Sequence, residues 1–348
     1  MAEVHLESVG FTYPGSADST LHGLDLNIDH GCAHALLGAS GTGKTTMLNL
    51  LSGLLHPTEG SIRFDSVDVS ELGARERNVA LVFQFPVLYE SKTVLENLMF
   101  PLVNRGWKVV DARARAREVA GELELESALE MKPERLSLFQ KQLAAIGKSL
   151  VRTDVDLVLL DEPLTAVDPA VKWRLRQILS RYQQGHELTT VYVTHDQTEA
   201  LTFADHVSVM AEGSILQTGT PEEIYDQPVS REVAEFVGSP GMQLVPCRVT
   251  GGEIDLPGFS CREKLYRDGG WTLGVRSAWC DLVDEEASPW QVTASRLLGT
   301  RQGEEIRLVT VMLGEMRLFA ETVMDCQIGQ RVAIRADRVV LFESDDGG

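Results

Sequence analysis

The chain has 348 residues, a net charge of −19, 43% hydrophobic residues and 24% charged residues, which suits a soluble globular protein of two domains. No run approaches the roughly eighteen apolar residues of a membrane-spanning helix, and the first residues do not resemble a signal peptide. We therefore expect the chain to stay in the cytoplasm. Because nucleic-acid binding normally needs a basic face, the acidity predicts a solvated acidic surface and no nucleic-acid partner.

The first 84 residues contain strand-like segments around a glycine-rich loop. Apolar and polar residues alternate at 4–6, 24–28 and 61–64, as in half-buried strands. Residues 33–37 form a short apolar strand, and residues 46–55 are compatible with a helix. Between them, residues 38–45 match the P-loop pattern G-x-x-x-x-G-K-[ST] without a mismatch. Strand, loop and helix in this order predict a nucleoside triphosphate site rather than an incidental turn.

The composition of this loop suits phosphate. Glycines let backbone N–H groups converge on phosphate oxygens, and the N-terminus of the following helix adds partial positive charge. We expect Lys44 to reach the β- and γ-phosphates and to take part in catalysis, and the Thr45 hydroxyl to bind Mg²⁺. The expected nucleotide contacts in this segment are Gly38, Ser40, Gly41, Gly43, Lys44, Thr45 and Thr46.

The rest of the chain predicts a helical insertion and a second domain. Residues of about 85–151 are helical in pattern, and strands return at 156–160 and 189–193 around a helix at 169–182. A parallel α/β core with a helical insertion accounts for this order, and we place that domain at residues 1–238. Short β runs cut by glycines predict a small all-β domain at 239–348. It includes a hairpin of 309–313 and 316–319 on a two-residue turn.

Two carboxylates follow the apolar strand at 157–160. Such a strand delivers Asp161 to Mg²⁺ and leaves Glu162 able to orient or deprotonate an attacking water. Other polar residues follow strands and turns, and one aromatic residue precedes the P-loop where it can stack on adenine: Gln84, Asp168, His195 and Tyr13. Each is weak evidence alone, since a histidine after a strand is more often structural.

Together and in this order, the motifs over residues 3 to about 240 resemble the nucleotide-binding subunit of ATP-binding-cassette (ABC) transporters. This resemblance implies a P-loop ATPase core with a helical subdomain, which binds ATP and Mg²⁺. It implies roles for the matching residues: adenine stacking by Tyr13, Mg²⁺ binding by Thr45, Gln84 and Asp161, general base by Glu162, and γ-phosphate binding by His195. Ser137 and Asp168 are expected at a dimer interface.

The C-terminal residues resemble the OB-like domain of carbohydrate-importer ATPases. The similarity lies at 274–276, 328–332 and 341–342. The residues Ser277-Ala278-Trp279 depart from the family, which usually continues Arg276 with Pro-Glu. A regulatory role and passive dimerisation are both open for this domain.

A motif of the helical subdomain is altered. In the family it reads Leu-Ser-Gly-Gly-Gln and its backbone meets the γ-phosphate of the opposite subunit, whereas residues 136–140 here lack both glycines. Leu138 and Phe139 put apolar bulk where phosphate oxygens should arrive. Either both side chains turn away and the backbone still serves, or the site is defective. The second interpretation predicts a heterodimer with another ATPase whose signature motif is intact.

Residues 84–89, the altered motif and residues 238–242 resemble a glycerol-type importer that uses two different ATPases. We therefore expect an ATP-hydrolysing subunit of an ABC importer for glycerol, a related polyol or a sugar. It would lie at the cytoplasmic face of the inner membrane with two membrane permease subunits, and indirectly with an extracytoplasmic solute-binding protein. Phe85 and Tyr89 are the expected contacts of a permease helix. The alternatives are a soluble cassette ATPase and an ATP-binding regulatory subunit with little hydrolysis.

Overall fold

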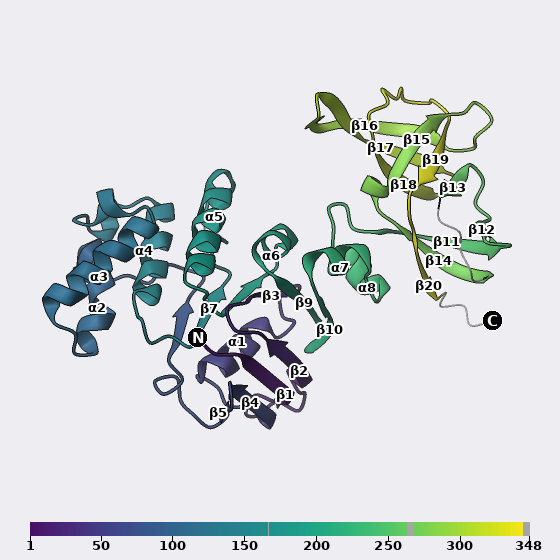
Figure 1. Cartoon of the computed structure of the whole chain (residues 1–348). Coiled ribbons are helices and arrows are strands. Elements are labelled where there is room, and N and C mark those ends of the chain that lie inside the picture. Colours follow the sequence, from purple (N-terminus) through teal and green to yellow (C-terminus); the bar gives the residue numbers. More distant parts are fainter. Residues whose placement is uncertain (166, 263–267, 344–348) are drawn as a thin grey trace. The chain divides into compact units, whose positions relative to one another are not determined.

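The computed structural model describes residues 1–165, 167–262 and 268–343. The chain forms two compact units, Met1–Pro221 and a second unit that begins at Glu222 (Figure 1). The predicted boundary at residue 238 lies further along, because the short helices α7 (Pro221–Asp226) and α8 (Arg231–Phe236) precede it. None of the helices in the described ranges combines the length and hydropathy that crossing a membrane requires.

A six-stranded sheet in the order β10-β9-β3-β8-β7-β6 forms the centre of the first unit. Its strands are β3 (Ala33–Leu37), β6 (Val79–Val82), β7 (Leu157–Asp161), β8 (Thr190–Thr194), β9 (His206–Ala211) and β10 (Ser214–Gly219). All neighbours are parallel except β9 and β10. Because the carboxyl ends of parallel strands meet at one edge, the P-loop after β3, Asp161 at the end of β7 and His195 after β8 share an edge. The predicted parallel α/β core is confirmed.

A second, antiparallel sheet in the order β2-β1-β4-β5 belongs to the same unit. It consists of β1 (Val4–Phe11), β2 (Leu21–Ile28), β4 (Glu59–Phe64) and β5 (Val67–Asp68). Its buried side chains share an apolar core with Met47, Leu50 and Leu51 of helix α1 (Lys44–Ser52), which follows the P-loop. This packing fixes α1 between two sheets.

A buried arginine closes the C-terminal end of α1. Arg77 is 1% exposed, and its guanidinium donates to the carbonyl oxygens of Leu50 and Leu51 in the last turn of α1. It also donates to the carbonyls of Leu72 at 2.8 Å and Ser70 at 2.9 Å. A cation at this helix end satisfies carbonyls that lack partners within the helix and complements the helix dipole.

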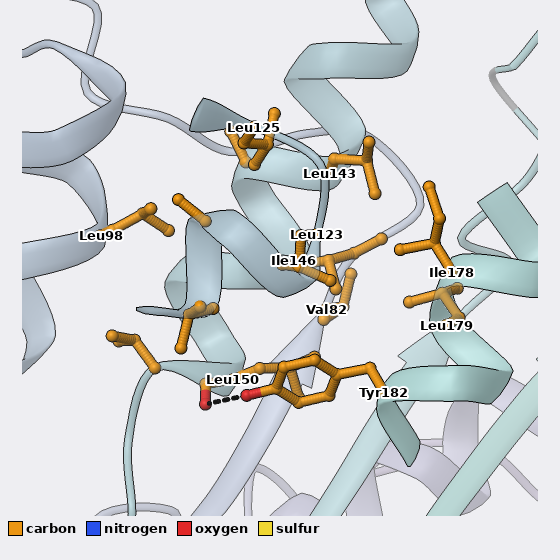
Figure 2. Close-up of a cluster of buried hydrophobic side chains, with 14 of the residues drawn as sticks. Val82, Leu98, Leu123, Leu125, Leu143, Ile146, Leu150, Ile178, Leu179 and Tyr182 are labelled. Carbon is orange, nitrogen blue, oxygen red and sulfur yellow. Dashed lines mark hydrogen bonds between the residues drawn. The ribbon is translucent and has the colours of Figure 1, made fainter. Parts of the chain in front are cut away.

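Three helices group beside the sheet: α2 (Val94–Asn104), α3 (Val109–Glu122) and α4 (Leu138–Leu150) (Figure 1). Capping boxes start α2, at Thr93 and Glu96, and α4, at Ser137 and Gln140. Figure 2 shows the apolar cluster between these helices and α5 (Pro169–Gly185), where the Tyr182 hydroxyl donates to the Leu150 carbonyl at 3.3 Å.

The second unit is built mainly of strands in three small sheets, ordered β12-β11-β14-β20, β13-β19-β15 and β16-β17-β18. The strands are β11 (Gln243–Thr250), β12 (Glu253–Ile254), β13 (Phe259–Cys261), β14 (Gly269–Val275), β15 (Cys280–Asp284), β16 (Gln291–Arg301), β17 (Glu304–Leu313), β18 (Met316–Thr322), β19 (Val332–Ala336) and β20 (Val340–Glu343). Leu313 pairs with Met316, which confirms the predicted two-residue hairpin turn. Within this unit, Arg276 is buried, lies over the ring of Tyr225 and donates to the Tyr225 carbonyl.

Candidate nucleotide site

The P-loop has the backbone shape that a phosphate cradle needs. A Cβ atom on Gly38 would lie 2.4 Å from the Met210 carbonyl oxygen, so only glycine fits against β9 there. Gly41 and Gly43 have φ angles of 84° and 98°, in the left-handed region. Gly43 is also the N-cap of α1, and the first N–H groups of that helix have no partner within it. Loop and helix end together offer donors to an anion.

Lys44 lies folded against its own loop. Its ammonium donates to the carbonyl oxygens of Gly38 at 2.8 Å and Ala39 at 2.6 Å, and reaches the Thr42 hydroxyl at 3.4 Å. Burial lowers the pKa of Lys44, while the nearby Glu162 and Asp161 carboxylates act to raise it. The ammonium is thus partly desolvated and close to two negative charges, and phosphate oxygens would compete with the loop carbonyls for it.

Glu162 is the centre of a polar cluster. Its Oε1 lies 3.1 Å from Nδ1 of His195, and its Oε2 accepts from the Gln84 amide at 3.4 Å and the Thr165 hydroxyl at 2.9 Å. Residue 162 has a φ of 43°, which is uncommon for a residue with a side chain. The structure therefore brings Glu162, His195 and Gln84 together.

The pKa values of the two adjacent carboxylates shift in opposite directions. Burial raises the pKa of Asp161, and the charge of Glu162 adds to this while Lys44 opposes it. Burial also acts to raise the pKa of Glu162, but hydrogen bonds from His195 and Thr165, with the charges of His195 and Lys44, leave it below its ordinary value. Glu162 is therefore held ionised, whereas Asp161 gains from any cation that approaches it.

The donor set at this edge suits Mg²⁺. Asp161, Thr45 and Gln84 supply a carboxylate, a hydroxyl and an amide oxygen, which are the hard oxygen ligands that Mg²⁺ prefers. The described residues contain no cluster of three or more His, Cys, Asp or Glu side chains that could hold a metal. Magnesium in nucleotide sites needs only one or two carboxylates, because phosphates and waters complete its shell.

Tyr13 lies next to the P-loop helix. Its hydroxyl is 3.1 Å from the Thr46 hydroxyl of α1, and its ring packs edge-on against Phe11. The Tyr13 side chain is exposed, as is Ser40 in the loop. This leaves an aromatic face beside the phosphate cradle, as adenine stacking requires.

Ser137 and Asp168 are not part of this cluster, because each caps its own helix. The Ser137 hydroxyl accepts from the Gln140 N–H at 3.2 Å, and the Gln140 side chain accepts from the Ser137 N–H at 3.0 Å. The Asp168 carboxylate accepts from the Ala170 N–H at 2.9 Å at the start of α5. Both residues thus lie at helix N-termini, where anions are favoured.

The two apolar residues of the altered motif behave differently. Leu138, the first residue of α4, is 46% exposed. Phe139 is half-buried against the apolar core, with the Arg174 guanidinium 5.8 Å from its ring centre. The Phe139 side chain is turned toward the apolar core, as one of the two expected outcomes requires. The Leu138 side chain is instead exposed at the start of the helix.

Two residues with clear contacts were not assigned from the sequence. The Thr165 hydroxyl donates a hydrogen bond to Glu162. The one feature of the sequence that could have indicated this contact is that Thr165 lies three residues after Glu162, in the same turn. Asn97 is fully buried and donates to the carbonyls of Tyr89, Lys92 and Thr93, while its side-chain oxygen accepts from the Tyr89 N–H at 2.8 Å. No sequence pattern would have distinguished this asparagine from an ordinary helix residue.

Comparison with known proteins identifies the family. The profile of the ABC transporter family matches residues 21–165. The chain is 34% identical over 344 residues to the sn-glycerol-3-phosphate import ATP-binding protein UgpC of Psychromonas ingrahamii, covering 97% of this chain and 88% of that protein. It is 38% identical over 292 residues to the diacetylchitobiose uptake system ATP-binding protein MsiK of Streptomyces coelicolor, covering 82% and 77%.

Among solved structures, the chain resembles a dimeric ATP-binding cassette in a post-hydrolysis state bound to ADP and Pi. The TM-score is 0.56 at 30% identity, covering 63% of this chain and 98% of that one. The class of protein is a nucleotide-hydrolysing cassette: a parallel α/β core that carries a P-loop, two carboxylates and a histidine at one edge of its sheet. The chain belongs to the ABC transporter family, as one of its ATP-binding subunits.

Proposed function

We propose that this chain is the ATP-hydrolysing, energy-coupling subunit of an importer for glycerol phosphate, glycerol, a related polyol or a sugar. The observation that carries the solute class is the similarity over 97% of the chain to a protein named for sn-glycerol-3-phosphate import. A second relative is named for diacetylchitobiose uptake, so the class covers small polyhydroxylated solutes. The ATPase itself does not select the solute, because that contact belongs to the membrane and solute-binding subunits.

In this proposal the nucleotide lies on the P-loop. Lys44 moves its ammonium from the Gly38 and Ala39 carbonyls to the β- and γ-phosphates, the loop N–H groups hold the phosphates, and Tyr13 stacks on adenine. Thr45, Gln84 and Asp161 hold Mg²⁺. When bound, this ion neutralises charge on the phosphate oxygens.

Glu162 and His195 act on the water side of the γ-phosphate. The ionised Glu162 accepts a hydrogen bond from the attacking water, whose oxygen bonds to the γ-phosphorus as the bond to the ADP oxygen breaks, and the proton that the water gives up passes by way of Glu162 to an oxygen of the released phosphate. A carboxylate with a lowered pKa is a weak base, so its main contribution is to orient this water. His195 donates to Glu162 from Nδ1–H and, when its ring is doubly protonated, donates from Nε2–H to a γ-phosphate oxygen.

The proposed contact with the permease is the segment 83–89, which we call the Gln84 segment. Its apolar residues Phe83, Phe85, Val87 and Tyr89 are exposed, Phe85 at 66%. The segment is anchored at its end, because the Tyr89 ring lies 4.4 Å from that of Phe100 and 5.2 Å from the Lys148 ammonium. An anchored loop with exposed apolar residues next to Gln84 suits a permease helix whose movement must reach the magnesium site.

Replacing Phe85 by serine tests this contact in the purified transporter. We expect ATP affinity within about twofold of the original, with solute-stimulated hydrolysis and transport lost. Val67→Ser is the matched control, since Val67 is a similarly exposed (57%) apolar residue on β5 in the other sheet. Equal effects of both variants, or unchanged transport in Phe85→Ser, would exclude the Gln84 segment as the coupling surface.

We further propose that the working assembly contains a second, different ATPase. Phosphate that reaches the start of α4 meets the exposed Leu138 where the family has glycine. A partner with Leu-Ser-Gly-Gly-Gln would complete the site that holds Lys44, Glu162 and His195, while Leu138 would face the nucleotide of the partner. One good site and one degenerate site result.

Hydrolysis by the purified chain tests this asymmetry. Alone, the chain should hydrolyse ATP far below the roughly 1 s⁻¹ or more of ordinary enzymes, and Leu138→Gly with Phe139→Gly should raise that rate. A normal rate for the unaltered chain would refute the heterodimer and leave the importer assignment standing. A Leu138→Gly single variant separates the exposed residue from the packed one.

The proposed location is the cytoplasmic face of the inner membrane, bound to two permease subunits. Purification of the chain from native membranes in mild detergent, with identification of the co-purifying proteins, tests location and partners together. Two membrane subunits and a second cassette ATPase are expected. Recovery only from the soluble fraction, without membrane subunits, would instead favour a soluble cassette ATPase.

A further inference from the structure

A buried glutamate outside the catalytic set lies under the His195 turn. Glu199, in helix α6 (Gln197–Phe203), is 2% exposed. Its Oε2 accepts from the hydroxyls of Tyr192 and Thr194, both at 3.0 Å, and its Oε1 accepts from the Lys172 ammonium at 3.0 Å. A carboxylate this deeply buried is retained only with such partners.

These contacts fix both neighbours of His195. Thr194 precedes it, and its hydroxyl accepts from the Asp196 N–H at 2.9 Å while donating to Glu199. Asp196 follows it, and its carboxylate accepts from the N–H groups of Thr198 at 2.9 Å and Glu199 at 3.3 Å. The backbone that carries the imidazole is therefore held on each side by one connected network.

The same network reaches the start of α5. Lys172 lies one turn after Asp168, and its N–H donates to the Asp168 carbonyl at 3.1 Å. Its ammonium lies 3.0 Å from Glu199 and 3.9 Å from Asp196. The Lys172–Glu199 pair thus attaches the helix that begins at Asp168 to the turn that carries His195.

We propose that Glu199 and Lys172 are positioning residues. They hold the His195 ring in place against the Glu162 carboxylate, and they connect the turn that carries His195 to the first turn of α5. The proposal rests on the proposed roles of His195 and Glu162. An apolar pair would fill the same space, but it would accept no hydrogen bond from the Thr194 hydroxyl and would form no ion pair between α5 and α6. Removal of Lys172 leaves the buried Glu199 without its counter-charge, and removal of Glu199 leaves the partly exposed Lys172 with only the more distant Asp196, whereas removal of both is tolerated better.

The test uses Glu199→Gln, Lys172→Met and the double variant in the full chain. Its first readout is nitrogen NMR of the histidine rings without nucleotide, at mildly alkaline pH where imidazole is neutral. The chain has eight histidines, and loss of one signal set in His195→Gln assigns His195. We expect the shifts of a single tautomer, with hydrogen on Nδ1, in the original chain. In both single variants the His195 nitrogen shifts should move toward the average of the two tautomers. In the double variant they should return part of the way to the values of the original chain.

The second readout is steady-state hydrolysis by the purified transporter. Each single variant should lower kcat roughly tenfold with KM for ATP within about twofold, and the double variant should recover most of the loss. Glu124→Gln is the matched control, because Glu124 pairs with Arg174, two residues along α5, and that pair is exposed. This control should change neither readout.

Several results would overturn the proposal. Unchanged His195 shifts and unchanged kcat in Glu199→Gln would do so, as would losses in which the double variant equals the sum of the single ones. If Glu199→Gln does not fold, the partly exposed Lys172→Met decides by the same measures. A transporter without ATPase activity but with the expected NMR shifts would contradict the proposed function alone.

Discussion

Replacing Arg77 by methionine tests how far the P-loop helix depends on its buried cap. Methionine keeps similar bulk but removes the hydrogen bonds to the carbonyls of Leu50, Leu51, Ser70 and Leu72. The Leu50 carbonyl keeps the bond from the Gly53 N–H at 3.2 Å and the Ser70 carbonyl keeps its contact with His56 Nδ1 at 3.0 Å, so the Leu51 and Leu72 carbonyls are the ones left unpaired. Each buried carbonyl left unpaired costs about 1–3 kcal/mol, and the relief of guanidinium desolvation offsets part of this. We expect a net loss of about 2–4 kcal/mol, which lowers the Tm of a unit this size by roughly 4–16 °C.

Scanning calorimetry of the full chain measures this loss. The transition of the first unit should move, while the transition of the second unit, which begins at Glu222, serves as an internal reference. Arg63→Met is the control, since the pair of Arg63 with Glu7 is exposed and worth at most about 1 kcal/mol. A shift of less than about 2 °C for Arg77→Met, or equal shifts for both variants, would refute the capping argument.

Three further results are expected. Tyr13→Ala should weaken ATP binding about 5- to 150-fold and Tyr13→Phe by less than about threefold, because stacking of a base is worth about 1–3 kcal/mol; equal losses in a fluorescent-nucleotide titration would exclude stacking. The lowered pKa of Glu162 means that its charge is lost only as pH falls through that value. Thr165→Ala should therefore move the acid limb of the ATPase profile upward, and an unmoved limb would contradict this. The raised pKa of Asp161 makes its ionised form costly in the folded state, so Asp161→Asn should raise Tm at neutral pH and lose that gain in acid, where Asp161 is itself protonated. The same change should weaken Mg²⁺-dependent binding, and a lower Tm at neutral pH would refute the sign.

Short-range patterns in the sequence predicted the phosphate side of the site. The strand expected at 33–37 is β3 with the same bounds, and the loop and helix follow it. The polar cluster was also within reach, because parallel strands bring their carboxyl ends to one edge once their order along the chain is known. Glu162 and His195 meet there at 3.1 Å.

Pairs that are distant in sequence could not be predicted in this way. Lys172 and Glu199 are polar residues on two helices, and only the packing of α5 against α6 shows that the buried Glu199 pairs with Lys172. No sequence motif surrounds Arg77. Its side chain is buried because it packs against the C-terminal end of α1, where it donates to the Leu50 carbonyl. The compact first unit ends at Pro221, earlier than composition indicated, because α7 and α8 lack a compositional contrast with the helices before them.

Residues 136–140 have two separate requirements: to start helix α4 and, in the proposed assembly, to leave room for a phosphate group. The capping box meets the first requirement alone. Ser137 and Gln140 begin the helix through reciprocal bonds, so the two positions between them are not needed to start it. Glycine there would even weaken the helix relative to leucine, by about 1 kcal/mol per residue. Residues 138 and 139 can therefore change during evolution without loss of the fold. For an engineer, substitutions at these two positions would test the proposed pairing with a second ATPase without removing the bonds that start α4.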